Sequence, residues 1–537
     1  MRKAHLLLGL ILGVFITASG QGYISGDLQV NADFFIRDTS IFSSKDQIPP
    51  QYDKQKTAVA SWLMVNYNNP DWNFDAGIRL DIFLNSNVFN PQEAYNAQGI
   101  GYWYVRKSFN KLKITGGYFY HQFGNGISYR SYEERALGID NATFGVLTEY
   151  DITDNLRISG FAGVIKNRLS LYKPMVIGAS IDGLVKAGKV TLIPGGAVLN
   201  RTLDEASMAL IVSTIESYPE EDRFIPKYNT YVFHAWNTLN YKNFSWMMEG
   251  AYKTSEAIVG EDGSTLEDNP GYVAYTTFTY AQKGLGITLA LKRTDKFSLR
   301  TSPNENPVLL QGLMNFIPPT ARQNSLRLTS RYNAATQEYE ETAGALDITF
   351  TPKKGHTMHF SYSEIWDNDF DDHFFTELYV DYENKKSRKF KTLVGFQFIN
   401  YNQTFYEDKP AGKEKVLAYT PFFHFTYNIT RKKSIRFEFQ YQNVKKDFGQ
   451  WLYGLVELTI APKWTFSVSD MWNFKPNSEN PSSKNQHYYS VFTSLTHKSH
   501  RFTLSYVKQV EGIVCTGGVC RFEPAFNGVR FQMLTNF

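Results

Sequence analysis

The sequence predicts an all-β protein, a large transmembrane antiparallel up-and-down β-barrel of about 24 strands (range roughly 22–26) with infolded loops. Three observations predict this fold. Alternating apolar and polar runs of roughly 10 to 14 residues recur along the chain, and the connections between them alternate between short and long. Aromatic residues make up 16% of the chain although its mean hydropathy is −0.35. A barrel wall reconciles these two values, because only alternate residues face lipid.

The chain is expected to begin with a secretory signal peptide, residues 1–20. Arg2 and Lys3 form a short basic region, an apolar run ends at Thr17, and Ala18-Ser19-Gly20 is a small-residue cleavage site. The apolar run is too short, and wrongly flanked, for a spanning helix. No later run approaches the length of apolar sequence that a spanning helix needs. Residues 21–537 are therefore expected to form a single outer-membrane β-barrel domain.

The stretch SIRFEFQYQNV, residues 434–444, shows the alternation most clearly. A strand directs successive side chains to opposite faces, whereas a helix would scatter them. We expect the apolar set to face lipid and the polar set to line the water-filled lumen. The apolar set is Ile435, Phe437, Phe439 and Tyr441; the polar set is Arg436, Glu438, Gln440 and Gln442, joined by Glu457 of the run WLYGLVELTI.

Similar runs predict the other wall strands. Soluble strands average about five or six residues, whereas these are long enough to cross a bilayer at a tilt. In chain order, strands are expected at 22–36, 58–68, 72–85, 99–108, 111–122, 141–151, 155–167, 175–184, 188–200, 227–241, 244–257, 271–283, 285–297, 342–351, 356–366, 373–385, 388–400, 415–428, 434–444, 451–460, 463–474, 485–496, 500–510 and 525–537.

One stretch does not fit an even strand count. Residues 298–333 include the strand-like NSLRLTSRYN, which would add a single extra crossing. We expect part of this stretch to fold into the lumen or across the mouth, and two extra wall strands are the alternative. Residues 122–140 and 201–226 are also expected as insertions into the lumen or along the rim. Within the latter, DEASMALIVSTIES predicts a short helix that starts after Asp204.

The connections also predict an orientation. Short turns such as NNPD, TPKKG and APK alternate with long loops, and several short turns are basic while several long loops are acidic. Barrels of the bacterial outer membrane have short periplasmic turns and longer external loops. We therefore expect the N- and C-termini to be periplasmic.

Three further features bear on sites and partners. Cys515 and Cys520, in VCTGGVC, are expected to form a local disulfide in an exported protein. The final run, VRFQMLTNF, resembles the signal that outer-membrane barrels present to their insertion machinery, through Val529, Phe531, Met533 and Phe537. The acidic DNDFDDH lacks the spacing of a calcium loop. We expect no metal and no cofactor.

The block YHQFGNGISYRSYEERALGIDNATFGV, residues 120–146, resembles an uncharacterised outer-membrane β-barrel family of Bacteroidota, a domain-of-unknown-function family. The stretch NFIP, followed by TARQ, is similar to a second signature of that family. The resemblance implies the outer membrane and a large barrel, and it implies no activity.

Four charges within the first of these blocks are candidates for a lumen or gate site: Arg130, Glu133, Glu134 and Arg135. The surrounding glycines permit unusual backbone paths. One interpretation is an infolded loop that narrows the pore and sets its selectivity, as charged rings do in channels. The other is a salt-bridged latch that braces the lumen wall. The sequence favours the latch slightly.

The chain carries no phosphate loop and none of the common hydrolase motifs, so we expect no enzyme. Its balanced charge, +4 overall, does not favour nucleic acid. Two functions remain open. The first is a gated or plugged conduit for polar solutes or larger cargo. The alternative is a non-catalytic scaffold subunit of an envelope assembly or secretion complex. Expected partners are outer-membrane lipids, the barrel insertion machinery and envelope proteins.

Overall fold

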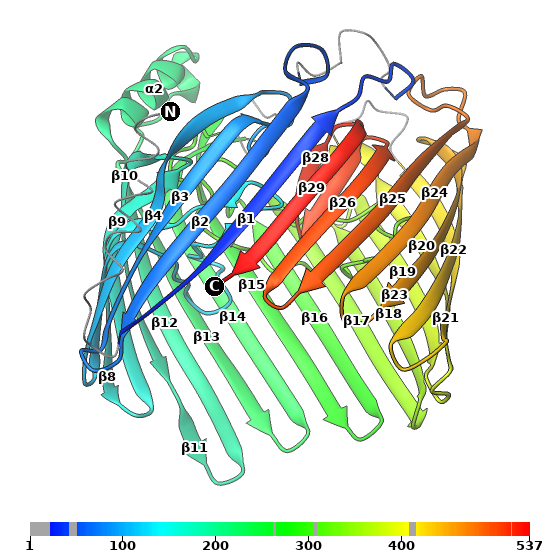
Figure 1. Ribbon diagram of the computed structural model, residues 1–537. Helices are drawn as coiled ribbons and strands as arrows, with labels where there is room; N and C mark the ends of the chain where they lie inside the picture. Colours follow the sequence, from blue (N-terminus) through cyan, green and yellow to red (C-terminus); the bar gives the residue numbers. More distant parts are fainter. Residues whose placement is uncertain (1–21, 42–50, 261–264, 306–308, 408–414, 517) are drawn as a thin grey trace, which may run out of the picture.

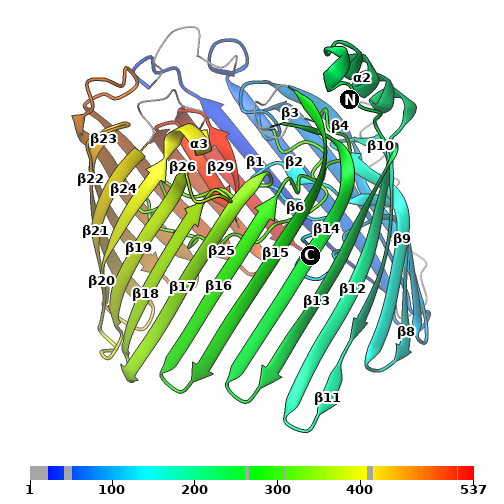
Figure 2. The same ribbon diagram turned by 180° about the vertical axis from the view of Figure 1, so that it is seen from behind.

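Twenty-four antiparallel strands close on themselves to form the wall in the computed structural model, which confirms the predicted fold and strand count. The structure describes residues 22–41, 51–260, 265–305, 309–407, 415–516 and 518–537, so the expected signal peptide lies outside the described residues. The barrel closes where β1 (Tyr23–Phe35) pairs with β29 (Phe526–Asn536), from Asp27 opposite Asn536 to Phe35 opposite Gly528. Each other wall strand pairs with its neighbours in sequence (Figures 1 and 2).

The remaining wall strands have the following bounds: β2 (Thr57–Asn69), β3 (Phe74–Ser86), β4 (Tyr95–Phe109), β5 (Leu112–Phe119), β8 (Thr143–Thr153), β9 (Leu156–Asn167), β10 (Ser170–Gly183), β12 (Val190–Thr202), β13 (Asn229–Tyr241), β14 (Phe244–Val259), β15 (Leu266–Gln282), β16 (Leu285–Asp295), β17 (Glu340–Lys353), β18 (His356–Trp366), β19 (His373–Asn384), β20 (Phe390–Asn402), β21 (Lys415–Asn428), β22 (Lys433–Val444), β23 (Gly449–Ile460), β24 (Trp464–Pro476), β25 (Gln486–His497) and β26 (His500–Gln509). The short β11 (Val185–Ala187) continues β10 along the same neighbour, β12.

Smaller elements lie in the loops and in the lumen. They are η3 (Gln51–Gln55), β6 (Glu133–Glu134), β7 (Ile139–Asp140), α2 (Glu205–Glu216), η4 (Glu220–Asp222), α3 (Gln403–Glu407), β27 (Gly512–Thr516) and β28 (Val519–Glu523). Among the described residues, no helix has the length and apolar character needed to cross a bilayer.

Both ends of the described chain lie at the rim that carries the short turns. Tyr23 pairs with Asn68, next to the first short turn, and the backbones of Gly26 and Phe537 exchange two hydrogen bonds of 2.9 and 3.0 Å. The opposite rim carries the long loops and α2 (Figure 1). We call these the short-turn end and the long-loop end.

The two faces of the wall separate as the alternation predicts. On β22, Phe437 and Phe439 are 42% and 53% exposed on the outside, whereas Gln440 and Gln442 are fully buried on the inside. The outer row continues from Phe437 through its paired residues Val456 and Val468, all three of which are exposed. The exterior is therefore an apolar band suited to lipid.

The helix predicted to follow Asp204 is confirmed, and it rests on the rim at the long-loop end (Figure 1). The Asp204 carboxylate caps it by accepting a hydrogen bond of 3.2 Å from the Ala206 amide. Its buried side chains, Met208, Ile211 and Ile215, pack against residues of the rim that include Ala257 and Leu266.

Residues 298–333 add no wall strand in their described part, so the 26-strand alternative is not what the structure shows. The strand-like stretch around Leu328 is a series of turns inside the lumen. Its backbone bonds to wall side chains rather than to a neighbouring strand: Leu328 N donates to Gln440 Oε1 at 2.8 Å, and Gln442 Nε2 donates to Leu328 O at 2.9 Å.

The separation of faces yields a test with neighbouring residues of β24. Val468→Arg places a charge on the apolar exterior and should destabilise the barrel in lipid vesicles by about 2–4 kcal/mol. Ser467→Arg places the same charge inside, opposite Glu457, and should cost far less. Urea unfolding of both variants in vesicles measures the difference; equal destabilisation would contradict the assigned faces.

Candidate functional site: a lumen filled by infolded segments

Two segments without long strands of their own occupy the lumen towards the long-loop end (Figure 2). The first infolded segment, residues 120–142, joins β5 to β8. The second infolded segment, residues 296–339, joins β16 to β17, and residues 306–308 within it lie outside the described part. Together they form the candidate functional site, because they decide how much of the lumen is open.

The two segments pack as one unit. The Arg130 amide donates to Met314 O at 2.8 Å, and the Phe316 amide donates to Gly126 O at 2.9 Å. A shared apolar core joins them to the inner faces of β8 to β15. From the segments it includes Phe123, Ile127, Tyr129, Phe297, Leu299, Met314 and Ile317. One segment therefore cannot leave without disrupting the other.

The tip of the first segment, FGNG, is anchored to β13 and β14. The Asn125 amide and side chain both donate to the Glu249 carboxylate, at 2.8 and 2.6 Å. Gly124 has a φ of +50°, and a Cβ there would lie 2.5 Å from a Glu249 oxygen. The anchor therefore requires glycine at this position, for its backbone conformation and for its close approach.

Buried ion pairs hold the rest of the first segment to the wall. Arg79 of β3 contacts Asp81 at 2.7 Å, and it reaches Glu133 and Asp140 of the segment at 2.9 and 2.5 Å. Lys166 of β9 also pairs with Asp140. Arg79 is only 3% exposed, so its charge depends on these carboxylates. We call this group of five residues the latch.

The environment of Asp140 keeps its carboxylate ionised. Burial opposes ionisation, but the attraction of Lys166 and Arg79 outweighs it, and the pKa of Asp140 is lowered below the usual carboxyl range. A lowered pKa in the folded state stabilises the fold at pH values above the normal carboxyl pKa. That contribution is lost only as the pH falls through the lowered value.

Wall cations hold the second segment in a recurring arrangement. Lys253 pairs with Glu256 at 2.7 Å and donates to Ser298 O of the segment at 2.8 Å. Lys292 pairs with Glu341 at 2.8 Å and donates to Pro318 O at 3.0 Å. Each buried lysine thus satisfies one wall carboxylate and one backbone carbonyl of the infolded segment.

The four candidate residues of the first segment make three different kinds of contact. Glu133 belongs to the latch, and Arg135 pairs with it at 2.7 Å while donating to Gln29 of β1 at 2.8 Å. Arg130 lies between the rings of Tyr132 and Phe316, 4.6 and 4.3 Å from their centroids. The Glu134 carboxylate accepts a local hydrogen bond from the Ala136 amide at 3.2 Å. These contacts favour the bracing interpretation of the charges.

The candidates on β22 and β23 differ in exposure. Arg436 pairs with Glu438 at 3.0 Å and with Glu457 at 3.2 Å, and it is partly open to the lumen. Gln440 and Gln442, expected to line water, are instead buried. The second infolded segment covers them, since both side chains bond to Leu328.

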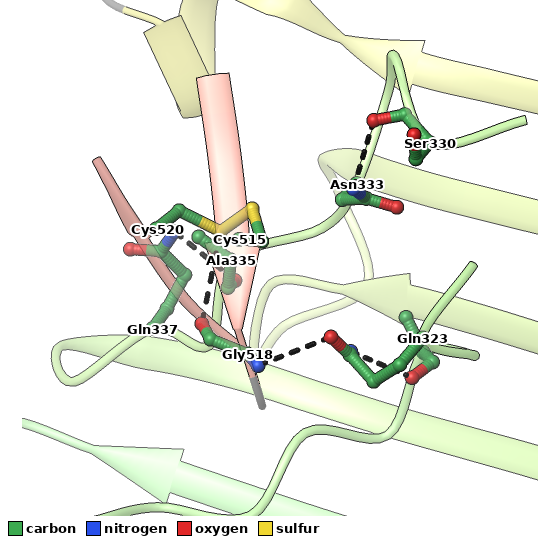
Figure 3. Close-up of a disulfide and its surroundings, with 9 residues drawn as sticks. Gln323, Ser330, Asn333, Ala335, Gln337, Cys515, Gly518 and Cys520 are labelled. Atoms are coloured by element: carbon green, nitrogen blue, oxygen red, sulfur yellow. Dashed lines mark hydrogen bonds between the residues drawn. A yellow bond between two sulfur atoms is a disulfide. The ribbon is translucent and has the colours of Figure 1, made fainter. Parts of the chain in front are cut away.

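Cys515 and Cys520 are joined by a disulfide across the β27–β28 hairpin (Figure 3). The hairpin contacts the second segment: Gly518 O accepts from the Thr336 amide at 3.0 Å, and the Gly518 amide donates to Gln323 Oε1 at 3.3 Å. The last long loop of the barrel therefore rests on the material that fills the lumen.

The C-terminal candidates lie on the outside of β29. Val529, Phe531 and Met533 pair with Phe34, Ala32 and Val30 of β1, on the face that carries the exposed Phe34. Phe537 ends the chain at the rim and is 58% exposed. Their role in insertion stays a prediction.

The sequence analysis missed the wall residues that receive the segments: Arg79, Lys166, Arg201, Lys253, Glu256, Lys292 and Glu341. A signal was present for three of them, because Arg201, Lys253 and Glu341 lie on the inward parity of a strand beside the buried apolar residues Leu199, Ala251 and Ala343. Towards the short-turn end the inward charges are more exposed, and Arg157 and Asp151 pair at 2.6 Å with side chains 52% and 41% exposed.

Within the described ranges, no group of three or more His, Cys, Asp or Glu side chains is placed to hold a metal ion.

The fold and the site define a transmembrane β-barrel with a filled lumen. The chain belongs to the family described as "Family of unknown function (DUF6029)", whose model matches residues 1–537. Among proteins with curated descriptions, none is significantly similar to this chain.

Several solved structures are similar to this chain at low identity, and three of them are described below. The siderophore receptor PirA from Pseudomonas aeruginosa is 7% identical with a TM-score of 0.43, over 97% of this chain and 81% of that one. The P pilus usher (PapC) translocation pore is 8% identical with a TM-score of 0.44, over 96% and 99%. The ferric citrate transporter FecA, unliganded, is 8% identical with a TM-score of 0.39, over 97% and 79%. Likeness this weak says nothing about substrate or mechanism.

The latch makes a testable prediction for the first segment. Asp140→Asn leaves Arg79 and Lys166 buried with one carboxylate fewer, which should weaken attachment of residues 120–142 by about 3–5 kcal/mol. Amide hydrogen exchange of this segment should therefore accelerate while exchange of the wall strands stays slow. Asp151→Asn is the matched control, because Asp151 also pairs with an arginine but is exposed. Equal exchange in the two variants would contradict the latch.

Proposed function

We propose that this protein is a gated conduit of the bacterial outer membrane for polar solutes or larger cargo, and that the two infolded segments are its gate. The observation that carries the proposal is the way the segments are held. Buried lysines, arginines and glutamines of the wall bind their backbone carbonyls and carboxylates, as Lys253 binds Ser298 O. When a segment leaves, water can replace each of these contacts.

The chemistry of these contacts supports a gate over a permanent plug. A buried ion pair adds little net stability compared with apolar packing of the same volume, but it fixes one arrangement specifically. A segment held this way is well positioned when closed and less costly to release than one held by apolar packing alone. The exposed charges towards the short-turn end, such as Arg157 and Lys113, provide a polar path on the other side of the gate.

We further propose that the short-turn end and both termini face the periplasm, and that the long-loop end faces outward. The support is the length division between the two rims, which is the rule for outer-membrane barrels. Lipid contacts the apolar exterior, and Val529, Phe531, Met533 and Phe537 serve as the recognition signal for the insertion machinery.

The conductance of planar bilayers tests the gate. Deleting residues 122–140 removes most of the first segment and its contacts with the second, so single-channel conductance should rise well above that of the intact protein. Deleting α2, residues 205–216, is the control, because that helix lies on the rim and should leave conductance unchanged. Unchanged conductance after the first deletion, in a variant whose barrel remains folded, would contradict the gate.

A second candidate function is a scaffold subunit of an envelope assembly, and the rim helix favours it. Leu210 on α2 is 53% exposed, and Ile225, which follows η4, is 87% exposed. Both are apolar side chains held at the long-loop end, where a protein partner could cover them.

The scaffold function predicts a stable companion. Extraction in mild detergent should recover a second envelope protein together with the barrel, and Leu210→Arg combined with Ile225→Arg should release it. Thr214→Arg, on the same helix, is the control for added charge. Recovery of the barrel alone from native membranes would contradict the scaffold and leave the conduit unaffected.

A further inference from the structure

A cavity of about 720 Å³ lies between the second infolded segment and the last loops at the long-loop end. Its size falls within the usual range for sites that bind small molecules, roughly 300–1,000 Å³. One side is residues 324–335 of the segment. The others are α3, the turn at Asp447 and Phe448, and the β27–β28 hairpin.

Two arginines of the segment lie on one side of this cavity. Ser330 N donates to Leu326 O at 3.0 Å and Arg331 N to Leu328 O at 3.3 Å, so residues 326–331 form a helix-like turn. Arg327 and Arg331 are four residues apart and therefore share a face of that turn. Like charges at this spacing repel each other, so the closed arrangement needs something to offset them.

Other residues of the chain balance the positive charge of Arg331 only in part. Its guanidinium lies 3.7 Å from Asp447 and 4.6 Å from the centroid of the Trp451 ring, while its Nε atom is buried without a partner among the described residues. Asp447 is shared with Tyr332, whose hydroxyl donates to it at 2.9 Å.

The positive charge of Arg327 is balanced even less by the rest of the chain. Within the described ranges its guanidinium makes no hydrogen bond and no ion pair, although it is open to the cavity. An exposed guanidinium without a partner on the protein is available to a ligand that supplies the opposite charge.

A third unsatisfied donor belongs to the same cavity. The Tyr406 hydroxyl, from α3, is buried and has no partner among the described residues. Four carboxylates also line the cavity, Glu407, Asp447, Glu511 and Glu523. Gln403 donates to Glu407, Tyr332 and Arg331 contact Asp447, and Arg521 pairs with Glu523. The groups left unsatisfied include Arg327, Arg331 Nε and Tyr406 Oη, which can donate to a ligand, and Asn333 Oδ1, which can accept from one.

We propose that this cavity is a binding site for a small organic oxyanion, a carboxylate, sulfate or phosphate ester, held chiefly by Arg327 and Arg331. The planar guanidinium fork matches these groups in a bidentate manner. The rings of Phe405 and Tyr406 give the remainder of the ligand an apolar surface. The site does not depend on the proposed conduit, because binding can occur with the lumen closed.

Anion titration of the full-length protein in detergent tests the site. Glucuronate, glucose 6-sulfate and glucose 6-phosphate represent the three sources of an oxyanion, and each is added at constant ionic strength balanced with chloride. Calorimetry should detect saturable binding of at least one of them at one site per chain. Trp451 fluorescence should change with the same midpoint, because its ring lies against Arg331. The anion that binds most tightly identifies the ligand's anionic group.

Variants of Arg327 make the test specific. Arg327→Gln should weaken binding roughly tenfold to a hundredfold, as expected for losing a charge-assisted hydrogen bond. Arg327→Lys should give an intermediate loss, because it keeps the charge without the fork. Arg157→Gln, at the other end of the lumen, is the control and should bind as the wild type does.

Two outcomes would overturn the proposal: no saturable binding of any of the three anions, or equal affinities for the wild type and a folded Arg327→Gln variant. Neither outcome bears on conductance. An unchanged conductance after deletion of residues 122–140 would, in turn, leave the binding result intact.

Discussion

The wall of this barrel must satisfy the backbone of the segments that fill it. A barrel of this many strands encloses a lumen too wide for wall side chains alone to fill, so two long loops fold inward. These loops lack long strands of their own, and a buried backbone amide or carbonyl without a partner is costly. Wall side chains supply the partners: Gln440 and Gln442 for Leu328, Lys253 for Ser298 and Lys292 for Pro318. The rest of the lumen depends on these contacts.

Apolar packing and polar contacts have different roles in holding the infolded segments. The core around Phe161, Phe297 and Met314 drives the segments out of water, in proportion to the apolar area that they bury. Apolar packing alone would tolerate several positions of a flexible segment. The buried ions set one position, because Arg79 is compensated only when Glu133 and Asp140 lie against it. Removing one partner of such a buried ion pair lowers the stability of a protein far more than replacing both partners with apolar residues does.

The sequence was sufficient to predict the wall and insufficient to predict how its lumen is filled. Period-two alternation and run length identified each of the 24 wall strands, because both follow from a strand that crosses lipid. Around Leu328 the same alternation has a different cause: Leu328 and Tyr332 are buried in two separate apolar clusters inside the lumen. Glu133 was recognisable within its glycine-rich loop, but its partner Arg79 was not. The strand that an infolded loop contacts depends on how the whole barrel closes. A local sequence pattern therefore cannot predict that contact.

The second infolded segment links the proposed gate to the cavity at the long-loop end. Residues 324–335 carry both the backbone bound by Gln442 and the arginines that line the cavity. A ligand can shift an equilibrium only by as much as its affinities for the two states differ. An oxyanion that binds Arg327 while leaving the Arg331 contact with Asp447 intact favours the closed state. One that replaces Asp447 as the partner of Arg331 removes an anchor of the segment and favours its release. If the proposed gate and the proposed site both exist, the direction of their coupling is decided at Asp447, by whether the ligand adds to the Arg331–Asp447 contact or displaces it.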